Sequence, residues 1–466
     1  MTTIEGIIER LRAGLAGRVI GPEDAEYDEA RAVFYGGFDR RPAAIVRAAN
    51  ADDVSRVVTV AADTGFELAV RSGGHSVAGH STTEGGIVLD LSEMRDLEID
   101  PESRTAWVEP GLTTGEYSVA ANAHGLATGF GDSGSVGIGG ITVGGGVGYL
   151  VRKYGLTIDD LLAADVVTAD GAILRVDEDQ HPDLFWAIRG GGGNFGVITR
   201  FKLRLHPVGT VVGGMLMLPA TPEVIAGFIA AAEAAPEELS TIANVMPAMP
   251  MPGVPEEHVG KLVVFGMLVH AGDPEDGQRA VAPFRALAEP LADMVGPMPY
   301  PAIFEEPEPE PEEGAEEYHP VGTHRTMFVN TIDRAFAETV LEHLEATDAP
   351  MRVAQLRVLG GAMARVPVEA TAYAHRNSRI MVNVAAVYED PARASEYESW
   401  VVQFADALRQ NDTGLYVNFV GDEGDAAIRE SYPGPTWDRL REIKARYDPD
   451  NLFRLNQNIP PGEAAS

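Results

Sequence analysis

The chain has 466 residues, of which 45% are apolar and 23% charged, so it predicts a soluble globular protein larger than one hydrophobic core. Its 36 basic and 70 acidic side chains give a net charge of −34, which repels phosphate backbones and anionic lipid and so excludes nucleic acid and membranes as expected partners. The absence of cysteine excludes disulfides, iron–sulfur clusters, thiolate metal sites and a cysteine nucleophile.

The sequence shows no signal for insertion into a membrane. No apolar run approaches the roughly 20 residues that span a bilayer, and residues 1–17 mix charge into their apolar positions without a signal-peptide core. We therefore expect a cytoplasmic protein. We also expect it to be a monomer or a homodimer.

Residues 1–208 carry most of the glycine clusters and many short β-branched runs bounded by turn residues, a pattern typical of strands. A helix is predicted over residues 51–64. The strands are too closely spaced for a simple alternating βαβ sheet, so the pattern predicts an α+β fold. The predicted strands lie at residues 43–48, 68–73, 86–91, 165–171, 173–177 and 196–208.

Residues 209–415 lack dense glycine clusters, and their amphipathic helices alternate with strand-like runs, which predicts a separate domain of sheet and helix. From residue 416 a basic amphipathic helix and a polar strip follow, and we expect this tail to return to the first domain. The predicted domains are 1–208, 209–415 and 416–466. Helices are predicted at 222–235, 335–346, 394–410 and 437–449, and strands at 260–272 and 379–388.

One acidic segment, residues 304–320, alternates proline with glutamate. Proline removes backbone donors and the carboxylates repel one another, so neither helix nor strand is expected and the segment predicts an exposed loop. A flexible insertion and a lid over a binding cleft both remain open.

Two glycine clusters call for an explanation. Residues 134–148 hold eight glycines in fifteen positions, and residues 190–199 hold five in ten. Such density implies close approach of the chain to something or repeated positive φ. Exposed N–H groups in a nest neutralise a diphosphate without lysine, whereas tight turns and close strand packing are the structural alternative.

Residues 191–196 match the dinucleotide pattern G-x-G-x-x-G, but a predicted helix precedes them and a predicted strand follows. The pattern binds a dinucleotide only in the reverse order, so a Rossmann site is excluded. No P-loop pattern occurs in the sequence.

The segment RSGGHSVAGHS, residues 71–81, places glycines directly before a histidine. His75 and His80, five apart, match no standard metal-ligand spacing, so no metal is expected. Met246, Met249 and Met251 lie between prolines and are more typical of an adaptable apolar surface than of a copper site. An ordinary structural histidine remains possible, as does an imidazole held beside a flavin whose diphosphate lies in the glycine nests.

A series of motifs between residues 71 and 461 resembles one family. The chain carries R-S-G-G-H-S, S-V-G-x-G-G-x-x-x-G-G-G-x-G, K-Y-G-L-T-x-D, V-V-T-A-D-G, D-L-F-W-A-I-R-G-G-G-G-N-F-G-V-I-T and Y-D-P-D-N-L-F-R-L-N-Q-N-I-P-P in that order. The set resembles the berberine-bridge-enzyme-like flavoproteins, which are FAD-linked oxidases of the vanillyl-alcohol-oxidase and p-cresol-methylhydroxylase (PCMH) type. The resemblance implies a discontinuous PCMH-type FAD-binding domain and an α/β substrate domain with an antiparallel sheet covered by helices.

The same resemblance implies FAD bonded covalently through a ring nitrogen of His75 to the flavin 8α-methyl group. Many relatives add a cysteine linkage at the position of Ser133, which cannot form a thioether, so a single linkage is expected. Val136 is the small residue expected where oxygen reaches the flavin, and it favours an oxidase. The positions implied to bind the cofactor are Arg71, Ser72, Gly73, Gly74, His75, Ser76, His80, Ser133, Val136, Gly137, Gly140, Thr142, Gly145, Gly146, Gly196, Val197, Asn418, Asn456 and Asn458.

Four further positions are candidates for catalysis. Gln355 and Arg357 alternate along one predicted strand and so face the same way, and Arg357 implies either an anionic or polar substrate group or an internal ion pair. Asn383 stands where some relatives hold a catalytic glutamate, and an amide cannot act as a base. Tyr416 matches the family's Y-x-N motif and is the preferred base, its pKa lowered by hydrogen bonds, with a packed aromatic as the alternative.

We expect an FAD-dependent oxidase that moves a hydride from a C–H or alcohol group of a small-molecule substrate to flavin N5, with molecular oxygen as acceptor and hydrogen peroxide as product. A flavin dehydrogenase or a secondary-metabolite tailoring enzyme shares every cofactor motif. A non-catalytic flavin-bearing protein that binds a small molecule is the alternative of a different class. Sugars, alcohols, alkaloids and polyketides all remain open as substrates, because function follows the site rather than the fold.

Overall fold

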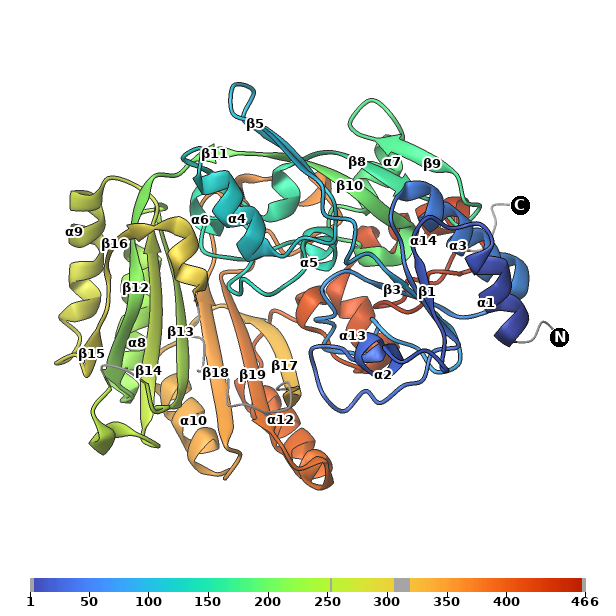
Figure 1. The fold of residues 1–466 in the computed structure, drawn as a ribbon. Coiled ribbons are helices and arrows are strands. Elements are labelled where there is room, and N and C mark those ends of the chain that lie inside the picture. Colours follow the sequence, from blue (N-terminus) through green and yellow to red (C-terminus); the bar gives the residue numbers. More distant parts are fainter. Residues whose placement is uncertain (1–3, 252–253, 306–318, 463–466) are drawn as a thin grey trace.

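The computed structural model describes residues 4–251, 254–305 and 319–462, which form two sheet-containing parts side by side (Figure 1). One part holds two smaller sheets, and the other holds one large antiparallel sheet. This combination with helices confirms the predicted α+β class. Most of the predicted acidic loop, residues 306–318, lies outside the described residues. Among the helices that the structure describes, none has the length and apolar character needed to cross a bilayer.

The first sheet is mostly parallel. Its strands follow the order β1-β2-β4-β3, in which β1 is the antiparallel edge. Helices α1 (Ile4–Arg12) and α3 pack on this sheet, and α3 has the predicted bounds, Ala51–Thr64. The Asn50 side chain caps its first turn and Gly65, at φ +71°, ends it. The strands are β1 (Arg18–Ile20), β2 (Ala44–Arg47), β3 (Leu68–Arg71) and β4 (Ile87–Asp90).

The second sheet is antiparallel, with strand order β5-β6-β10-β8-β9. Helices α4 (Thr114–Asn122) and α7 (Pro182–Ala187) share its core with the C-terminal helix α14 (Pro435–Tyr447). A two-stranded ribbon pairs β7 with β11. The strands are β5 (Leu97–Asp100), β6 (Thr105–Val108), β7 (Leu126–Ala127), β8 (Leu161–Val167), β9 (Ile173–Val176), β10 (Val197–Arg204) and β11 (His206–Pro207).

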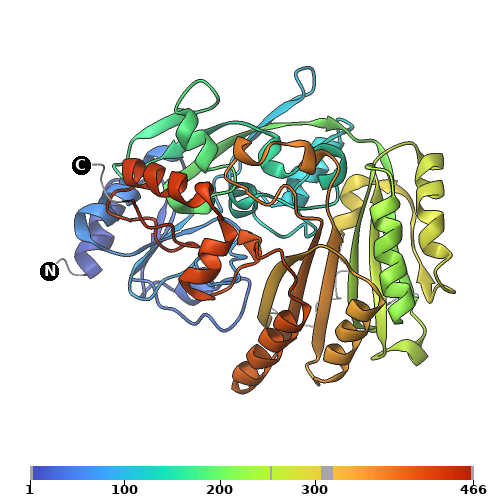
Figure 2. The ribbon, with the colours of Figure 1, turned by 180° about the vertical axis from the view of Figure 1, so that it is seen from behind.

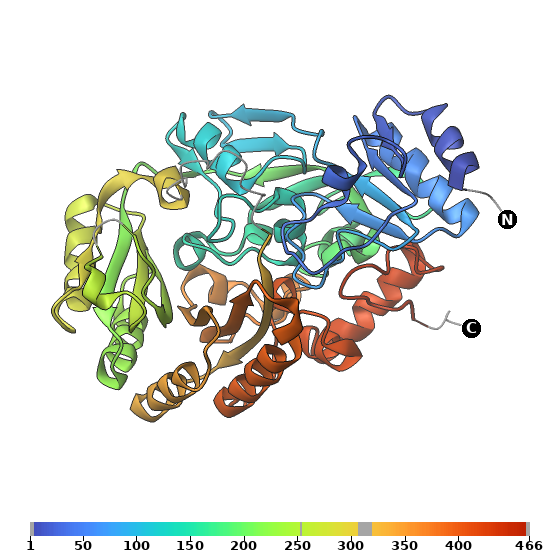
Figure 3. The same cartoon turned by 60° about the horizontal axis from the view of Figure 1, so that its bottom comes forward.

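A buried lysine of the C-terminal segment bonds to the first part through the carbonyl of Asn194. The Lys444 ammonium donates to the Asp448 carboxylate at 2.7 Å, to the carbonyl of Asn194 at 2.8 Å and to that of Phe453 at 3.2 Å. Both charged side chains are fully buried, so each needs these partners. Figure 3 shows α14 beside the N-terminal elements, far from the outer edge of the large sheet.

The large sheet has strand order β15-β12-β14-β13-β18-β19-β17, with β16 also paired to β12. Figure 2 shows four helices on one face of this sheet. Side chains alternate between the two faces along each strand, and those on the covered face pack against the helices in one core. The helices are α8 (Pro222–Ala234), α9 (Pro274–Arg285), α10 (Arg334–Glu345) and α12 (Ala394–Leu408). The strands are β12 (Thr210–Pro219), β13 (Leu239–Pro247), β14 (Leu262–His270), β15 (Ala292–Asp293), β16 (Gly296–Pro299), β17 (Val321–Val329), β18 (Met351–Val358) and β19 (Ile380–Tyr388).

The opposite face of the large sheet is turned toward the first part. Arg357 of β18 bonds to Asp132 and to the carbonyl of Val147, both in the first part. The predicted domain boundaries, 208/209 and 415/416, fall in connecting segments, the first between β11 and β12 and the second after α12. The remaining helices are α2 (Tyr27–Arg31), α5 (Ile138–Gly144), α6 (Val151–Tyr154), α11 (Ala362–Arg365) and α13 (Gly424–Ser431).

The glycine run 134–148 distinguishes between the two alternatives of close approach and repeated positive φ. Residues Ile138–Gly144 form helix α5, and of the eight glycines only Gly145 and Gly146 have positive φ, at 142° and 78°. Five of the other six have close neighbours that leave little room for a side chain: a Cβ on Gly139, for example, would lie 3.0 Å from the Ser72 Cβ, whereas Gly140 has open space. Of the two alternatives, close approach holds along most of the run, and positive φ holds at Gly145 and Gly146.

Candidate functional site

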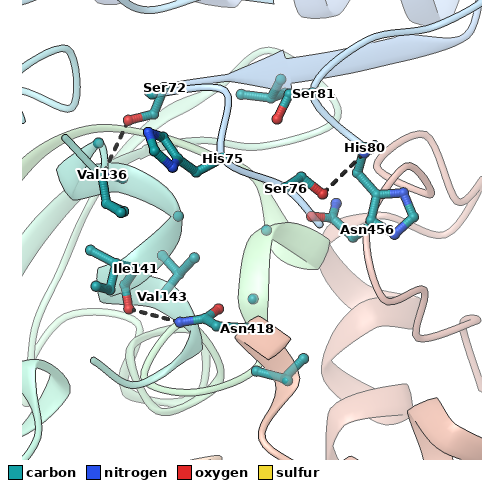
Figure 4. Close-up of a pocket in the computed structure, with 18 of the residues that line it drawn as sticks. Ser72, His75, Ser76, His80, Ser81, Val136, Ile141, Val143, Asn418 and Asn456 are labelled. Carbon is teal, nitrogen blue, oxygen red and sulfur yellow. Dashed lines mark hydrogen bonds between the residues drawn. The ribbon is translucent and has the colours of Figure 1, made fainter. Parts of the chain in front are cut away.

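A cavity of about 300 Å³ lies within the first part, between the first sheet, helix α5 and the C-terminal segment (Figure 4). Five separate segments supply most of its wall, which brings together parts of the chain almost 400 residues apart. Its lining is mainly apolar side chains and glycine backbone, with a few polar groups. Most of the lining comes from residues 72–77, 136–143, 192–198, 416–420 and 455–457.

The loop that follows β3 approaches the loop before α5 more closely than side chains would permit. A Cβ on Gly73 would lie 2.4 Å from the backbone nitrogen of Gly137, and one on Gly137 would lie 2.3 Å from that of Gly73. Gly74 has a φ of +73°. The Ser72 hydroxyl donates to the Pro110 carbonyl at 2.6 Å and accepts from the Gly139 N–H at 3.2 Å. These contacts fix where the next residue, His75, enters the cavity wall.

His75 is held as a neutral imidazole. Burial lowers its pKa to about 4, although a backbone hydrogen bond with Ser135 acts in the opposite direction. The Phe34 ring stacks on the imidazole with centroids 4.0 Å apart and planes 20° apart. At neutral pH the ring therefore carries a nitrogen lone pair at the cavity wall, which is the nucleophilic form.

His80, the second histidine of the loop, also lines the cavity. Burial lowers its pKa to about 4, and Arg40 adds to this effect. Its backbone N–H donates to the Ser76 hydroxyl at 3.1 Å, whereas its Nε2 is buried without a hydrogen-bond partner. A buried ring nitrogen without a partner is an unfilled polar position at the wall of the cavity.

Tyr416, from the C-terminal segment, forms part of the cavity wall, and its phenol oxygen accepts two hydrogen bonds. The Gly146 N–H lies at 3.0 Å and the Asn418 amide nitrogen at 2.9 Å. Gly145 allows the close approach, because a Cβ there would lie 3.1 Å from the Tyr416 ring. The predicted lowering of the Tyr416 pKa is wrong: burial raises it, and outweighs the lowering by the two donors and by Arg357.

Arg357 does not line the cavity and does not offer a free guanidinium. Its Nη2 pairs with the Asp132 carboxylate, its Nη1 donates to the Val147 carbonyl at 3.0 Å, and its Nε donates to Gln355 Oε1 at 3.0 Å. The Gln355 amide in turn donates to Asn244 Oδ1 at 3.0 Å. Of the two interpretations of Arg357, the internal ion pair is the one that the structure shows.

Asn383 lies opposite Gln355 on the neighbouring strand β19 and does not line the cavity. Its Oδ1 is buried without a hydrogen-bond partner. Of the four candidate catalytic residues, Tyr416 alone lies in the cavity wall, while Gln355, Arg357 and Asn383 occupy the adjacent face of the large sheet. Arg357 contacts the cavity wall from outside, since it lies over the Phe419 ring at 5.2 Å and bonds to the Val147 carbonyl.

Most positions implied to bind the cofactor do line the cavity. They are Ser72, Gly73, Gly74, His75, Ser76, His80, Val136, Gly137, Gly140, Gly196, Val197, Asn418 and Asn456. Figure 4 shows Ser72, His75, Val136, Asn418 and Asn456 arranged around the same space. The structure therefore brings the R-S-G-G-H loop, the glycine run and the C-terminal strip together.

The other implied positions are not in the cavity wall, and four of them have other contacts. Arg71 is buried in a pair with Asp90 at 2.8 Å. Ser133 bonds to the Ser135 hydroxyl at 3.0 Å instead. Gly145 and Gly146 contact Tyr416: Gly145 lies against its ring, and the Gly146 N–H donates to its phenol oxygen. Thr142 and Asn458 also lie outside the wall, each with a buried side-chain oxygen that has no partner.

Several lining residues escaped the sequence analysis. Asn194 is fully buried, and its side chain ties the second glycine cluster to the carbonyl of Gln457 at 3.1 Å and to the N–H of Ile459 at 3.0 Å. An asparagine among glycines was the available signal. Tyr432 contributes a buried hydroxyl without a partner, and Asp132 contributes a carboxylate. Nothing in their local sequence distinguishes these two from ordinary tyrosine and aspartate.

The cavity fits a flavin dinucleotide in its chemistry. A flat apolar ring needs a wall of small apolar residues, which Val136, Ile141 and Val143 supply. The polar diphosphate part needs backbone N–H groups, which the glycine-rich segments supply, and polar atoms without protein partners, which the His80 and Tyr432 side chains supply. No group of three metal-ligating side chains close enough to hold an ion occurs in the described ranges.

Comparison with known protein families finds two matches. The family described as FAD binding domain matches residues 42–177, and the family described as berberine and berberine like matches residues 415–460. The two matches together contain His75, Val136, Tyr416 and Asn456.

Comparison with individual proteins extends the similarity over nearly the whole chain. The chain is 30% identical to (R)-6-hydroxynicotine oxidase of Paenarthrobacter nicotinovorans over 96% of this chain and 97% of that protein. It is 28% identical to xylooligosaccharide oxidase of Thermothelomyces thermophilus, with 91% and 88% covered. The crystal structure of 6-hydroxy-D-nicotine oxidase from Arthrobacter nicotinovorans superimposes with a TM-score of 0.85 at 28% identity, covering 96% of this chain and 99% of that one.

Proposed function

Because the chain belongs to the berberine-like family of FAD-linked oxidoreductases, we propose that it is an oxidase of a small molecule with molecular oxygen as electron acceptor. The observation that carries the proposal is the single cavity wall shared by neutral His75, the small side chain of Val136 and the phenol of Tyr416. Relatives named as oxidases act on a hydroxynicotine and on xylooligosaccharides, which supports a small-molecule substrate.

We propose that FAD is held by the glycine-rich segments and bonded covalently through His75 alone. The neutral imidazole has the lone pair that such a bond needs. The sequence has no cysteine for a second bond, and Ser133 lies outside the cavity wall. Bound FAD supplies the two-electron chemistry: it accepts a hydride from a substrate C–H and passes both electrons to oxygen, giving hydrogen peroxide.

Tyr416 is the proposed acceptor of the substrate's O–H or N–H proton. Its phenol oxygen receives hydrogen bonds from Gly146 and Asn418, and both donors stabilise the negative charge of a phenolate. Burial opposes this and keeps the pKa above its ordinary value. The phenol is therefore protonated at neutral pH, and its capacity to accept a proton grows as the pH rises.

Val136 supports the choice of oxygen as acceptor. Its side chain lines the cavity, and its backbone is fixed by the Thr114 N–H, which donates to the Val136 carbonyl at 2.9 Å. A small side chain at this fixed position leaves room for oxygen.

The holoenzyme is to be screened for hydrogen peroxide production against amines, secondary alcohols and oligosaccharides. The account expects at least one class to give one peroxide per oxygen consumed, with Tyr416→Phe strongly slowed on the same substrate. Turnover that reduces an artificial dye but consumes no oxygen would contradict the oxidase and favour a dehydrogenase. A flavin that no substrate class reduces would favour a binding protein.

A further inference from the structure

The aromatic ring that stacks on His75 comes from a segment outside every motif of the family resemblance. Phe34 lies three residues after α2, and its ring covers one face of the imidazole at 4.0 Å between centroids. The ring is 37% exposed, so burial alone does not explain its position.

The first residue of the R-S-G-G-H motif holds this segment in place. The Arg71 guanidinium donates to the carbonyl of Ala30 at 2.6 Å and to that of Ala32 at 3.1 Å, while Asp90 balances its charge at 2.8 Å. Arg71 is 6% exposed and does not line the cavity. A buried arginine whose donors go to two carbonyls of one segment fixes the path of that segment.

A backbone hydrogen bond completes the connection between the two segments. The Phe34 N–H donates to the carbonyl of Gly74 at 3.3 Å, and Gly74 directly precedes His75. The Phe34 backbone is therefore tied to the residue before the histidine, and its ring lies on the histidine itself. The ring plane of His75 is set from one face by Phe34 and at its edge by the backbone of Ser135.

We infer that Phe34 is a positioning residue for the covalent attachment of FAD, which holds the His75 imidazole in the plane needed for the bond, and that Arg71 maintains Phe34 there. This inference rests on the proposed covalent linkage. A nucleophile held in one orientation reacts faster than one that rotates freely, because the rotational entropy is lost before the reaction begins.

The bond-forming step balances with the reactants of the proposed function. A ring nitrogen of His75 forms a bond to the carbon of the 8α-methyl group. The methyl group loses one proton, the imidazole loses its ring proton, and the electron pair remains on the flavin. Molecular oxygen then takes the two electrons and two protons as hydrogen peroxide, so each covalent bond formed consumes one oxygen molecule.

The test compares variants of Phe34 produced in a host with limited riboflavin, so that part of each protein lacks flavin. FAD is added, and the flavin that stays with the protein after acid precipitation is measured over time and divided by the total bound flavin. Phe34→Leu keeps the apolar volume but removes the planar face, Phe34→Tyr keeps the face, and Ile173→Ala changes an exposed apolar residue on β9, away from the site.

We expect the rate of covalent attachment in Phe34→Leu to fall about five- to tenfold, which is the usual worth of one aromatic stack. Phe34→Tyr and Ile173→Ala are expected to match the wild type. A leucine variant that attaches flavin at the wild-type rate overturns the role of Phe34 and leaves the covalent bond intact. Wild-type protein that releases all its flavin into acid overturns the covalent bond and the role of Phe34 together.

A second measurement addresses the orientation without flavin. In apoprotein labelled at histidine ring carbons, the Phe34 ring current shifts the His75 Cε1–H resonance, which His75→Ala identifies by its loss. We expect this resonance to move toward the value of free histidine in Phe34→Leu and to stay in Phe34→Tyr. An unchanged resonance in Phe34→Leu means that the imidazole is not held by Phe34, which contradicts the inference even if the leucine variant binds no FAD.

Discussion

The backbone N–H of Gly146 donates a 3.0 Å hydrogen bond to the phenol oxygen of Tyr416, which lies 270 residues further along the chain. The bond joins the glycine run of the first part to the C-terminal segment at the wall of the cavity. Gly145 and Gly146 have positive φ, which directs this N–H toward the phenol. The glycines at the end of the run therefore serve Tyr416, and the earlier ones serve the close packing around the cavity.

Removing the Tyr416 hydroxyl tests its proposed role as proton acceptor. Tyr416→Phe keeps the ring and its packing, so the flavin spectrum should not change. The rate of flavin reduction by an accepted substrate, followed by stopped-flow absorbance, should fall by about 10²–10⁴-fold, the usual worth of a general base. A rate close to that of the wild type would show that Tyr416 only packs.

The pH dependence of the same step follows from the raised pKa of Tyr416. A base is active in its deprotonated form, so the reduction rate should rise with pH throughout the range below that pKa and level off only in strong alkali. The Tyr416→Phe rate should lack this rise. A wild-type profile that is flat from pH 6 to 9 on a substrate without a titrating group would contradict the assignment.

The Arg357–Asp132 pair should contribute to stability across the two parts. The Arg357 side chain is 4% exposed and that of Asp132 is 29% exposed, so removing one partner leaves a buried charge with fewer contacts. We expect Asp132→Asn to lower the free energy of unfolding by about 2–4 kcal/mol. This is less than the loss expected for a fully buried pair, because Asp132 is partly exposed. Urea denaturation at equal flavin content measures this.

A matched control is the exposed pair Arg10–Asp63, whose side chains are 44% and 54% exposed. Asp63→Asn should change stability by no more than about 1 kcal/mol. Equal effects of Asp132→Asn and Asp63→Asn would show that the buried pair has no special role.

Acid should destabilise the apoprotein through its buried histidines. Burial lowers the pKa of His75, His80 and His324 to about 4, whereas an unfolded histidine titrates near 6.5. Above pH 6.5 these rings are neutral in both states. As the pH falls from 6.5 toward 4, the free energy of unfolding decreases, because the unfolded chain then binds protons that the folded chain does not.

His324 is the suitable site for a test, since it does not line the cavity and its Nε2 is buried without a partner. His324→Gln should reduce the loss of stability between pH 6.5 and 4 by about 1–3 kcal/mol, measured by urea denaturation of apoprotein at both pH values. An identical loss in the variant and the wild type would mean that His324 titrates alike in both states.

The C-terminal strip should be needed for flavin binding. Phe453 and Ile459 are buried in the cores of the first part, and Asn456 lines the cavity. Deleting residues 450–466 should abolish flavin incorporation. Asn456→Ala should keep the fold, judged by circular dichroism, and bind FAD more weakly. A truncated protein with the full flavin absorbance would show that the strip is dispensable.

Local signals in the sequence were sufficient for many elements. The predicted helix at 51–64 has a side-chain cap at Asn50 and a left-handed glycine at position 65, so local residues determine where it begins and ends. The family resemblance also implied that the R-S-G-G-H loop and the C-terminal strip bind one cofactor, and both line the same cavity. In contrast, helix α5 was missed, because glycine is a poor helix former and packing against Ser72 overrides that preference.

The partners of individual side chains could not be read in advance. Arg71 was assigned to the cofactor, yet it holds the segment of Ala30 and Ala32 beside His75. The partner of Arg357 is Asp132, 225 residues away, and no local pattern marks that pairing. The direction of the Tyr416 pKa depends on complete burial, a property of the folded molecule that the Y-x-N motif does not express.

The oxidase assignment can be tested most directly without knowing the substrate. The holoenzyme is reduced with one equivalent of dithionite in the absence of air and mixed with air-saturated buffer in a stopped-flow instrument. The account predicts rapid, complete recovery of the oxidised flavin spectrum with one hydrogen peroxide per flavin, slowed in Val136→Leu. A flavin that stays reduced for minutes in air, but is reoxidised at once by an artificial electron acceptor, would contradict the oxidase.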